Sequence, residues 1–495
     1  MSEKKINFVG VFEIIFAVIV ILAGIVLRWK VWQTDLSFWV DEDALIRNAF
    51  GILDGKYPIW RGLEAEYSPP MFFALTKPLY WIFGLNEIAF RFLPFMASVL
   101  ALLAMAVLSK KVLKTPFLFL IPLAILAVNE NLLFYTQYYK FYATDFLVAL
   151  LISIAVFYLS FDKMSYKQAV LWGILSGVAS WSAYSAIFYL VGIFGVLFVK
   201  ILFNFSKEKF FKFLILSVPA GILTCWYYIE VVIRRTNLEW LKSAWNEIGN
   251  GYFYPHNYDD VFNLFHYHTA LNFSTWQLWA FIALMVIGFV LMILKYKLKA
   301  IYFVSPCVVM LLLAFAGKYP FIERQTLFLL PMFLILIFKT GDFVDFYKNG
   351  KVFGIVSFCF LIVVANLWKT FDISYLREIW DNRQYFCMST AREFYKHLET
   401  EYRQGDWVYS KGRDASLRIY DKDNNLINFD KNIEEVEDFD NFVKRIPLGS
   451  RVHIYIAEYP FVGDEFLKNY DFIKNNYAII QEIKEPSGIY VLFRR

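Results

Sequence analysis

Long apolar runs follow one another from the N-terminus to about Leu367, and short charged connectors separate them. A helix that crosses a bilayer needs roughly 20 apolar residues, and most of these runs approach that length. The pattern predicts about 11 transmembrane helices. They lie near residues 8–27, 88–108, 117–133, 146–159, 169–181, 186–202, 211–228, 276–294, 301–316, 327–338 and 352–367. The tightest reversal is expected around Ser182 to Ser185, where one long apolar stretch must hold two spans.

A different pattern follows Thr370. Charges of both signs become frequent, and the short β-like runs "GDWVYS", "RVHIYIAEY", "YAIIQEI" and "GIYVLF" alternate with helical patterns such as "STAREFYKHLETEY". We therefore divide the chain into a transmembrane domain, residues 1–370, and a small soluble α/β domain, residues 371–495, whose size is ordinary for a domain.

Composition agrees with a polytopic α-helical membrane protein. Of the 495 residues, 59% are hydrophobic and only 19% charged, and the mean hydropathy of +0.47 lies outside the range of soluble domains. The net charge of +5 comes from basic residues scattered over the connectors. Nucleic acid is therefore not an expected partner, whereas membrane lipids are.

Lysines occupy every second connector, which sets the expected orientation. Cytoplasmic loops carry the excess of basic residues, and the lysine-rich connectors alternate with others if Lys4 and Lys5 are inside. This places the first outer loop, about residues 28–87, and everything after Thr370 on the extracytoplasmic side of the plasma or inner membrane. Arg28, Trp29 and Lys30 after the first run favour an anchor over a cleaved signal peptide.

The first outer loop contains the acidic sequence "FWVDEDALIR", with Asp41, Glu42 and Asp43 in succession. One interpretation is a solvated helix start, with Asp41 or Asp43 as the N-cap. The other is a catalytic acid cluster. Farther along, Pro69 and Pro70 prevent one helix from running through the loop, so we expect short interfacial helices there.

Two further outer loops contain titratable groups. The second reads "TQYYKFYATD" and contains Gln137, Lys140, Tyr142 and Asp145. If it is helical, these side chains spread along one broad face, although Lys140 and Asp145 are also compatible with a simple interfacial pair. The late loop "KYPFIERQTLFLL" contains Arg324, whose planar donors match two phosphate oxygens at once. Lipid head groups are the alternative partner for this arginine.

Metal and nucleotide chemistry find little support in the sequence. His266 and His268 have the spacing of strand neighbours, and His256 precedes them, but no carboxylate or cysteine signature accompanies these histidines. No Walker loop, GxGxxG, CxxC pair, HExxH or GxSxG motif is present. We therefore predict neither a metal site nor a cofactor.

Taken together, four segments resemble one family of membrane enzymes. "FWVDEDALIRNAF", "SPPMFFALTKPLYWIFGLNEIAFRFLPFMASVLALL", "QYYKFYATD" and "YPFIERQTLFLLPMF" resemble the GT-C glycosyltransferases of the protein O-mannosyltransferase and aminoarabinose transferase superfamily. The resemblance extends from the N-terminus to about Leu367 and is strongest in the first third. It implies a GT-C fold and transfer of a sugar from a polyprenyl-phosphate donor to an extracytoplasmic lipid, polysaccharide or protein acceptor.

The resemblance also implies roles for single residues. Asp41 and Glu42 match the Asp-Glu pair of the family, which makes both candidate catalytic residues and Asp41 the implied base. Arg324 falls where a late outer loop of the family places an arginine beside the donor phosphate, and Lys140, Tyr142 and Asp145 fall where relatives carry basic, tyrosine and acidic residues. We therefore expect Lys140 and Arg324 to bind the donor phosphate, and Tyr142, Asp145 and Gln137 to bind substrate. Ser68 stands where some aminoarabinose transferases have a lysine before the proline pair, which argues against that particular sugar.

Elementary chemistry is consistent with these roles. A sugar on a lipid phosphate already has a good leaving group, so the enzyme needs one base for the acceptor hydroxyl and cations for the phosphate. A single in-line displacement of this kind inverts the anomeric centre. Two alternatives remain: a polymerase or ligase of lipid-linked glycans, and a transporter or flippase. The second would place ionisable residues within the spans, where this chain has few.

Overall fold

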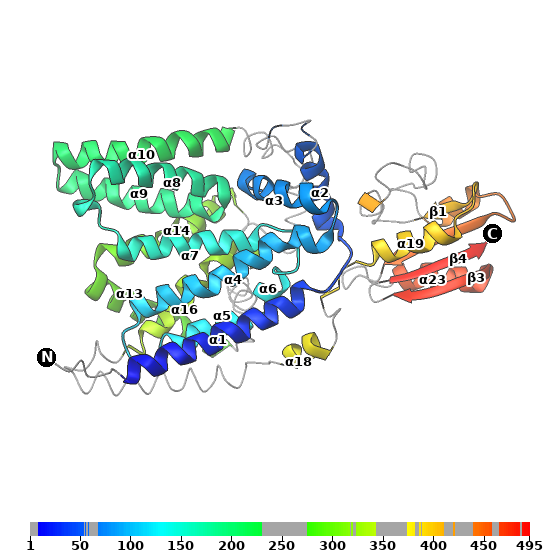
Figure 1. The fold of residues 1–495 in the computed structure, drawn as a ribbon, viewed down its shortest axis with the longest axis horizontal. Coiled ribbons are helices and arrows are strands. Elements are labelled where there is room, and N and C mark those ends of the chain that lie inside the picture. The colour runs from blue at the N-terminus through cyan, green and yellow to red at the C-terminus, as the bar shows by residue number, and fades with distance from the viewer. Residues whose placement is uncertain are drawn as a thin grey trace.

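The computed structural model describes most of the chain as a helical bundle followed by a small β-sheet region that lies beyond one end of the bundle (Figure 1). The described residues are 8–53, 55, 58, 68–229, 275–316, 318–319, 323–342, 374–381, 386–387, 389–409, 419–420, 439–457, 465–485 and 488–495. We call the end of the bundle next to the sheet the sheet-facing end.

The bundle is built from apolar helices that coincide with the predicted spans. They are α1 (Phe8–Trp32), α4 (Glu87–Val112), α5 (Leu120–Val128), α6 (Glu130–Phe134), α7 (Tyr142–Tyr158), α8 (Tyr166–Ser182), α9 (Ser185–Phe203), α10 (Lys207–Tyr227), α13 (Thr275–Tyr296), α14 (Leu298–Phe315) and α16 (Leu330–Lys339). Of the described helices, α1, α4, α9, α10 and α14 have both the length and the composition to cross a membrane. The eleventh predicted span, 352–367, lies outside the described residues.

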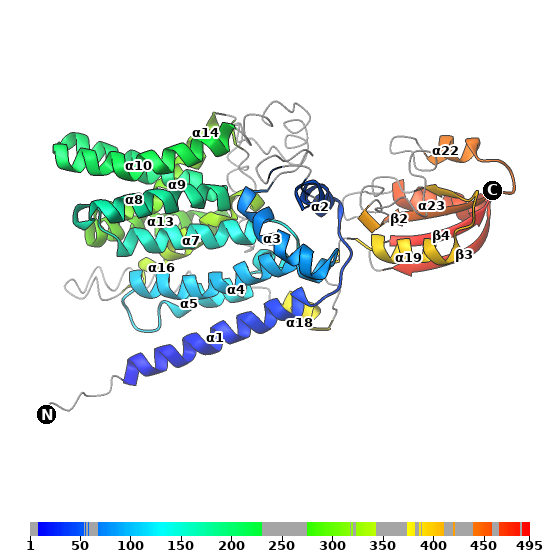
Figure 2. The same ribbon diagram turned by 45° about the horizontal axis from the view of Figure 1, so that its top comes forward.

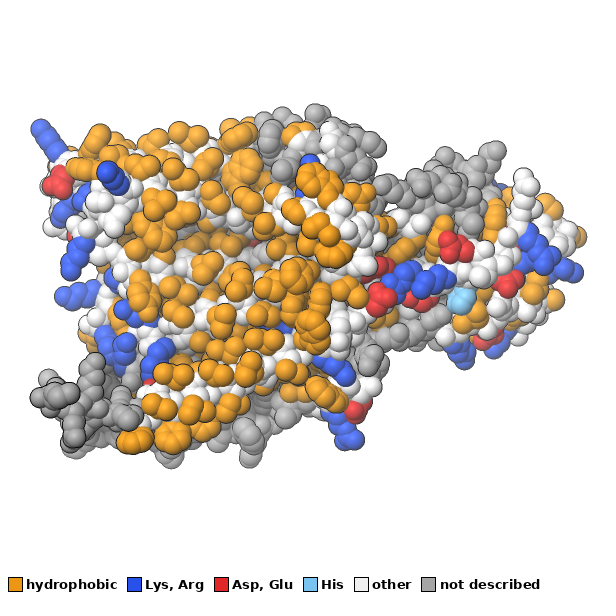
Figure 3. Space-filling model, in the orientation of Figure 1, with side chains coloured by type: hydrophobic (Ala, Val, Ile, Leu, Met, Phe, Trp, Pro, Cys, Tyr) orange, Lys and Arg blue, Asp and Glu red, His pale blue; other side chains and the backbone are white. Residues whose placement is uncertain are grey.

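Apolar side chains cover the flank of the bundle (Figure 3), as expected for a surface that faces lipid tails. Helix α1 lies along one side of the bundle in both ribbon views (Figures 1 and 2), and its window of highest hydropathy is only 11% buried. It contacts mainly α4 and α5. The exposed apolar surface of α1 supports its prediction as a membrane anchor.

The third predicted span, 117–133, is interrupted in the structure. Helix α5 ends at Val128, and Asn129 starts α6 by accepting a hydrogen bond from the amide of Leu132. The buried guanidinium of Arg28 donates to the carbonyl oxygens of Leu126 and Ala127 at 3.0 and 2.9 Å. These donors satisfy carbonyls that lose their helical partners at the break, which makes the interruption tolerable inside the bundle.

Lys and Arg side chains gather at the end of the bundle opposite the sheet (Figure 3). Contacts there join the connectors to one another: Lys200 pairs with Asp162 at 2.7 Å, and the buried carboxylate of Asp342 accepts the amides of Lys114 and Thr115 at 3.0 and 2.7 Å. A short 3-10 helix, η1 (Phe161–Lys163), lies in one of these connectors. Among the described connectors, the lysine-rich ones therefore lie at one end of the bundle, as the predicted alternation requires.

Short helices form at the sheet-facing end. Helix α2 (Val40–Leu53) and helix α3 (Pro70–Phe83) lie in the first predicted outer loop, and α15 (Glu323–Thr326) with η3 (Leu327–Leu329) leads into α16. Helix α3 begins at Pro70, as expected from the proline pair, because a proline at the first helical position loses no hydrogen bond. Helix α2 begins at Val40, so Asp41 and Asp43 lie within its first turn and are not N-caps.

The C-terminal region forms a four-stranded sheet in the order β1-β2-β4-β3. Strand β1 (Trp407–Tyr409) pairs in parallel with β2 (Arg451–Ala457), and β4 (Gly488–Arg494) pairs antiparallel with both β2 and β3 (Ala478–Glu485). Helices α18 (Ser374–Asp381), α19 (Ala391–Glu401), α22 (Phe439–Arg445) and α23 (Glu465–Asn476) complete the described part. All four strands coincide with predicted β-like runs.

Candidate active site

Three of the predicted site residues meet at the sheet-facing end of the bundle. Asp41 lies in the first turn of α2, Lys140 in the connector before α7, and Arg324 on α15. Arg324 Nη1 donates to Asp41 Oδ2 at 3.1 Å, and Lys140 Nζ lies 4.0 Å from the same oxygen. The Lys140 side chain is 3% exposed, whereas those of Asp41 and Arg324 are each 24% exposed. The site therefore combines one partly accessible carboxylate with two cations.

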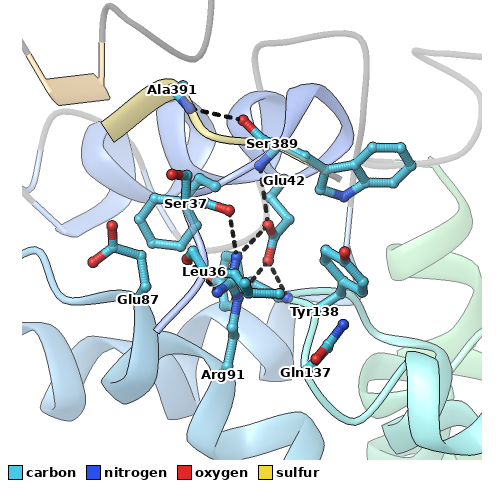
Figure 4. Close-up of polar contacts among 12 residues, drawn as sticks. Leu36, Ser37, Glu42, Glu87, Arg91, Gln137, Tyr138, Ser389 and Ala391 are labelled. Atoms are coloured by element: carbon cyan, nitrogen blue, oxygen red, sulfur yellow. Dashed lines mark hydrogen bonds and ion pairs between the residues drawn. The ribbon is translucent and has the colours of Figure 1, made fainter. Parts of the chain in front are cut away.

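Glu42 has a different environment from Asp41 (Figure 4). Its carboxylate is fully buried and receives a fork from Arg91 of α4: Nε donates to Oε1 at 3.0 Å and Nη2 to Oε2 at 2.7 Å. Arg91 is itself buried and donates to the carbonyl oxygens of Leu36 and Ser37. Such a forked pair holds both side chains in one geometry.

Two backbone amides also donate to Glu42. The amide of Tyr139 reaches Oε1 at 2.6 Å, and the amide of Trp39 reaches Oε2 at 3.2 Å. The second contact is half of a capping box, in which the third residue of a helix bonds back to the residue before the helix. Because Tyr139 directly precedes Lys140, Glu42 ties the start of α2 to the connector that contains Lys140. Glu42 thus fixes the neighbours of both Asp41 and Lys140.

Arg91 is not among the residues predicted for the site. The signal that points to it is an arginine inside the predicted span 88–108, because a charged residue at membrane depth usually has a partner or a function. The partner itself lies 49 positions away along the chain.

The other predicted site residues make different contacts. Residues 135–141 are not helical, so the broad helical face expected for this loop does not form. Gln137 accepts a hydrogen bond from Thr34 and donates to the carbonyl of Phe386. Asp145 accepts the amides of Tyr184 and Ser185 at 2.8 and 3.3 Å, and so holds the reversal between α8 and α9.

The ring of Tyr142 packs against those of Tyr135 and Phe141, each with a centroid separation of 4.7 Å. The alternative pair between Lys140 and Asp145 is replaced by the approach of Lys140 to Asp41. Tyr319, close to Arg324 in sequence, donates to Gln325 and packs its ring against Phe188.

Among the residues that the structure describes, no group of three or more His, Cys, Asp or Glu side chains is arranged to hold a metal ion. His256, His266 and His268 lie outside the described residues.

Comparison with known proteins gives a similarity of fold. No family model matches the sequence, and no curated protein matches it. The crystal structure of ArnT from Cupriavidus metallidurans in the apo state aligns over 98% of each chain with a TM-score of 0.52 and 10% sequence identity. This similarity shows the GT-C fold that the four sequence segments predict.

Two other structures align with lower scores. ArnT from Cupriavidus metallidurans bound to undecaprenyl phosphate aligns over 96% of this chain and 97% of the other, with a TM-score of 0.48 and 11% identity. The Archaeoglobus fulgidus oligosaccharyltransferase in complex with zinc and sulfate aligns over 81% of this chain and 61% of the other, with a TM-score of 0.46 and 14% identity.

Proposed function

We propose that this chain is a glycosyltransferase that moves a sugar from a polyprenyl-phosphate donor to an acceptor hydroxyl on the extracytoplasmic side of the membrane. The observation that carries the proposal is the meeting of Asp41, Lys140 and Arg324 on one carboxylate oxygen. These residues come from three separate segments of the chain, and each belongs to a segment that resembles the GT-C enzymes. The shared fold with ArnT supports the same class of reaction.

The proposed reaction needs one base and compensation of charge on the phosphate. The Asp41 carboxylate takes the proton of the acceptor hydroxyl, whose oxygen attacks the anomeric carbon. The bond from that carbon to the phosphate oxygen breaks, and the electron pair leaves with the polyprenyl phosphate. Lys140 and Arg324 stabilise the charge that develops on the phosphate, because cations in a partly desolvated site act more strongly than in water. One displacement of this kind inverts the anomeric configuration.

Other predicted residues take supporting roles in this proposal. Glu42 positions Asp41 through Arg91 and the first turn of α2. Gln137 and Asp145 shape the site through the backbone that they hold, and Tyr142 is the proposed contact to substrate. The lysine-rich end of the bundle lies opposite the site, which supports an extracytoplasmic position for Asp41 and the C-terminal sheet.

The proposal is tested by measuring how well variants of Lys140 and Arg324 use the sugar donor. Purified protein is supplied with a panel of undecaprenyl-phosphate-linked hexoses and pentoses, and mass comparison of envelope glycans between a deletion strain and its parent identifies the sugar and acceptor. A charged hydrogen bond contributes about 1.5–3 kcal/mol, so Arg324→Ala and Lys140→Ala should each lower kcat/KM roughly 10- to 150-fold.

Two further variants complete this test. Arg324→Lys should recover only part of the loss, because an ammonium cannot fork onto two phosphate oxygens. Lys200→Ala is the matched control, since it removes an ion pair at the opposite end of the bundle. Full activity in both alanine variants at the site would remove these cations from the reaction.

A further inference from the structure

The C-terminal region contacts the short segment that leads into α2. We call residues 35–38 the entry segment. Arg392, at the start of α19, donates to the Asp35 carboxylate at 2.7 Å and to the Asp35 carbonyl oxygen at 2.6 Å. The Ser37 hydroxyl donates to Glu393 and accepts the amide of Arg392. These contacts join parts of the chain more than 350 positions apart.

Tyr420 adds another contact from the C-terminal region. Its hydroxyl accepts the amide of Phe38 and donates to Glu87 at the start of α4, both at 2.9 Å. Arg392 Nη1 reaches the same Glu87 oxygen at 3.1 Å. The ring of Tyr420 also stacks on that of Phe38, with 6.4 Å between centroids. The entry segment is therefore held together with the start of α4.

The opposite side of the entry segment is held by Arg91. Its guanidinium donates to the carbonyl oxygens of Leu36 and Ser37 at 2.6 and 3.0 Å, and the same group forks onto Glu42 (Figure 4). Every residue of the entry segment thus has a contact to Arg91 or to the C-terminal region. Asp41 follows three residues later, next to Glu42.

The carboxylates around Arg392 stabilise its charged form and so maintain its ion pairs with the entry segment and with Glu87. Burial opposes its charged form, but the hydrogen bond that Arg392 donates to Asp35 and the carboxylates of Glu87 and Glu393 together raise the pKa of Arg392 above its ordinary value. The side chain is 15% exposed, so the pair with Glu87 is partly shielded from solvent. Arg392 therefore stays charged throughout the pH range in which proteins fold.

We propose that Arg392 of the C-terminal region is a positioning residue for the catalytic base, because it fixes the entry segment against Arg91 and thereby sets the place of Asp41. This inference rests on the proposed function, in which Asp41 is the base. The C-terminal region then contributes to the rate of transfer without touching the reacting atoms. Small displacements of a base are costly, since a 1 Å misplacement can lower a rate by about 100-fold.

Hydrogen exchange on the full-length protein tests, without any substrate, whether Arg392 holds the entry segment in place. Arg392→Met should speed amide exchange in residues 35–43 by roughly 10-fold or more relative to the parent, because local opening then needs less free energy. Tyr420→Phe, which removes only a hydroxyl, is a milder second variant. Arg451→Met is the matched control, because Arg451 pairs with Glu401 and Asp406 inside the C-terminal region. The control should leave residues 35–43 unchanged.

Kinetics separate a positioning role from a purely structural one. For folded Arg392→Met, we expect kcat to fall roughly 10- to 100-fold while the KM for the donor stays within about threefold. Binding of undecaprenyl phosphate, used as a probe of Lys140 and Arg324, should not change. Arg392→Lys should recover part of the loss in kcat, because it keeps the charge but loses the fork.

The outcomes distinguish this inference from the proposed function. Unchanged exchange in residues 35–43, or faster exchange with normal kcat, overturns the positioning role of Arg392 and leaves the proposed reaction intact. Full activity of Asp41→Asn overturns the proposed base instead. When Asp41→Asn is combined with Arg392→Met, the second substitution should add little further loss, because the group that it positions is already inactive. Fully additive losses contradict the proposal.

Discussion

The adjacent carboxylates Asp41 and Glu42 should differ in how much unfolding free energy the protein loses when each is replaced by its amide. Asp41→Asn removes a carboxylate that is 24% exposed, pairs with Arg324 at 3.1 Å and lies 4.0 Å from the Lys140 ammonium. Solvent-exposed pairs contribute about 0–1 kcal/mol, and this pair is partly exposed, so the free energy of unfolding should fall much less than in Glu42→Gln. Glu42→Gln removes the partner of a buried arginine, and the stability of the fold should fall strongly.

The expected loss for Glu42→Gln follows from its contacts. Glu42 accepts two hydrogen bonds from Arg91 and one each from the amides of Tyr139 and Trp39. The amide of Gln keeps one acceptor oxygen. Its NH₂ group replaces the other oxygen and then faces N–H donors, with which it cannot form hydrogen bonds. Buried Arg91 then loses the carboxylate that it forks onto, and breaking a buried pair in this way costs about 3–5 kcal/mol.

The assay is denaturant unfolding of purified protein in detergent micelles, with the midpoint and slope fitted for each variant. Arg91→Gln and the double variant complete a cycle, and the double variant should lose less than the sum of the single losses because it leaves no unpaired charge. An unfolding midpoint of Glu42→Gln equal to that of the parent would refute the structural role of the pair.

Two more predictions concern other parts of the molecule. Burial lowers the pKa of His453 despite its hydrogen bond to Asp406. An unfolded histidine titrates near about 6.5, so the unfolded chain binds a proton at this position more readily than the folded chain. The C-terminal sheet should therefore lose stability as the pH falls below about 6.5. Thermal unfolding at pH 7.5 and 5.5 measures this, and His453→Gln should flatten the difference. At Gly173, a Cβ would lie 2.4 Å from the carbonyl oxygen of Leu216 on α10, so Gly173→Ala should separate α8 from α10 and lower the unfolding midpoint. Gly221 has open space where a Cβ would be, so Gly221→Ala should leave the midpoint unchanged. Equal midpoints for the two variants would contradict the close packing of α8 and α10.

Much of the architecture can be predicted from local pattern. Apolar runs locate the helices, Pro70 starts α3, and alternating residues locate β2, β3 and β4. These features depend on neighbours in sequence, which the period of apolar residues and the backbone limits of proline report directly. The interruption at Asn129 is different, because it depends on hydrogen bonds that Arg28 of α1, far away in sequence, donates to the carbonyl oxygens of Leu126 and Ala127.

The candidate site also combines positions that can be predicted from the sequence with contacts that only the fold creates. The resemblance to the GT-C family assigns Asp41, Lys140 and Arg324 to one site, whereas local pattern alone shows three separate polar positions; the fold brings them together. The environment of Glu42 cannot be read from sequence, because its partner Arg91 lies 49 positions away on another helix. Likewise, the contact of Arg392 with the entry segment arises only when the C-terminal region meets the bundle.

The most direct test of the account is the turnover of Asp41→Asn with an undecaprenyl-phosphate-linked sugar and its acceptor. Asparagine keeps the size of the side chain and removes its basicity, so we expect turnover to fall by about 10²- to 10⁴-fold while undecaprenyl phosphate still binds. Asp162→Asn, which breaks an ion pair at the lysine-rich end, controls for loss of a carboxylate and should keep normal turnover. Near-normal turnover in folded Asp41→Asn would contradict the assignment of Asp41 as the base.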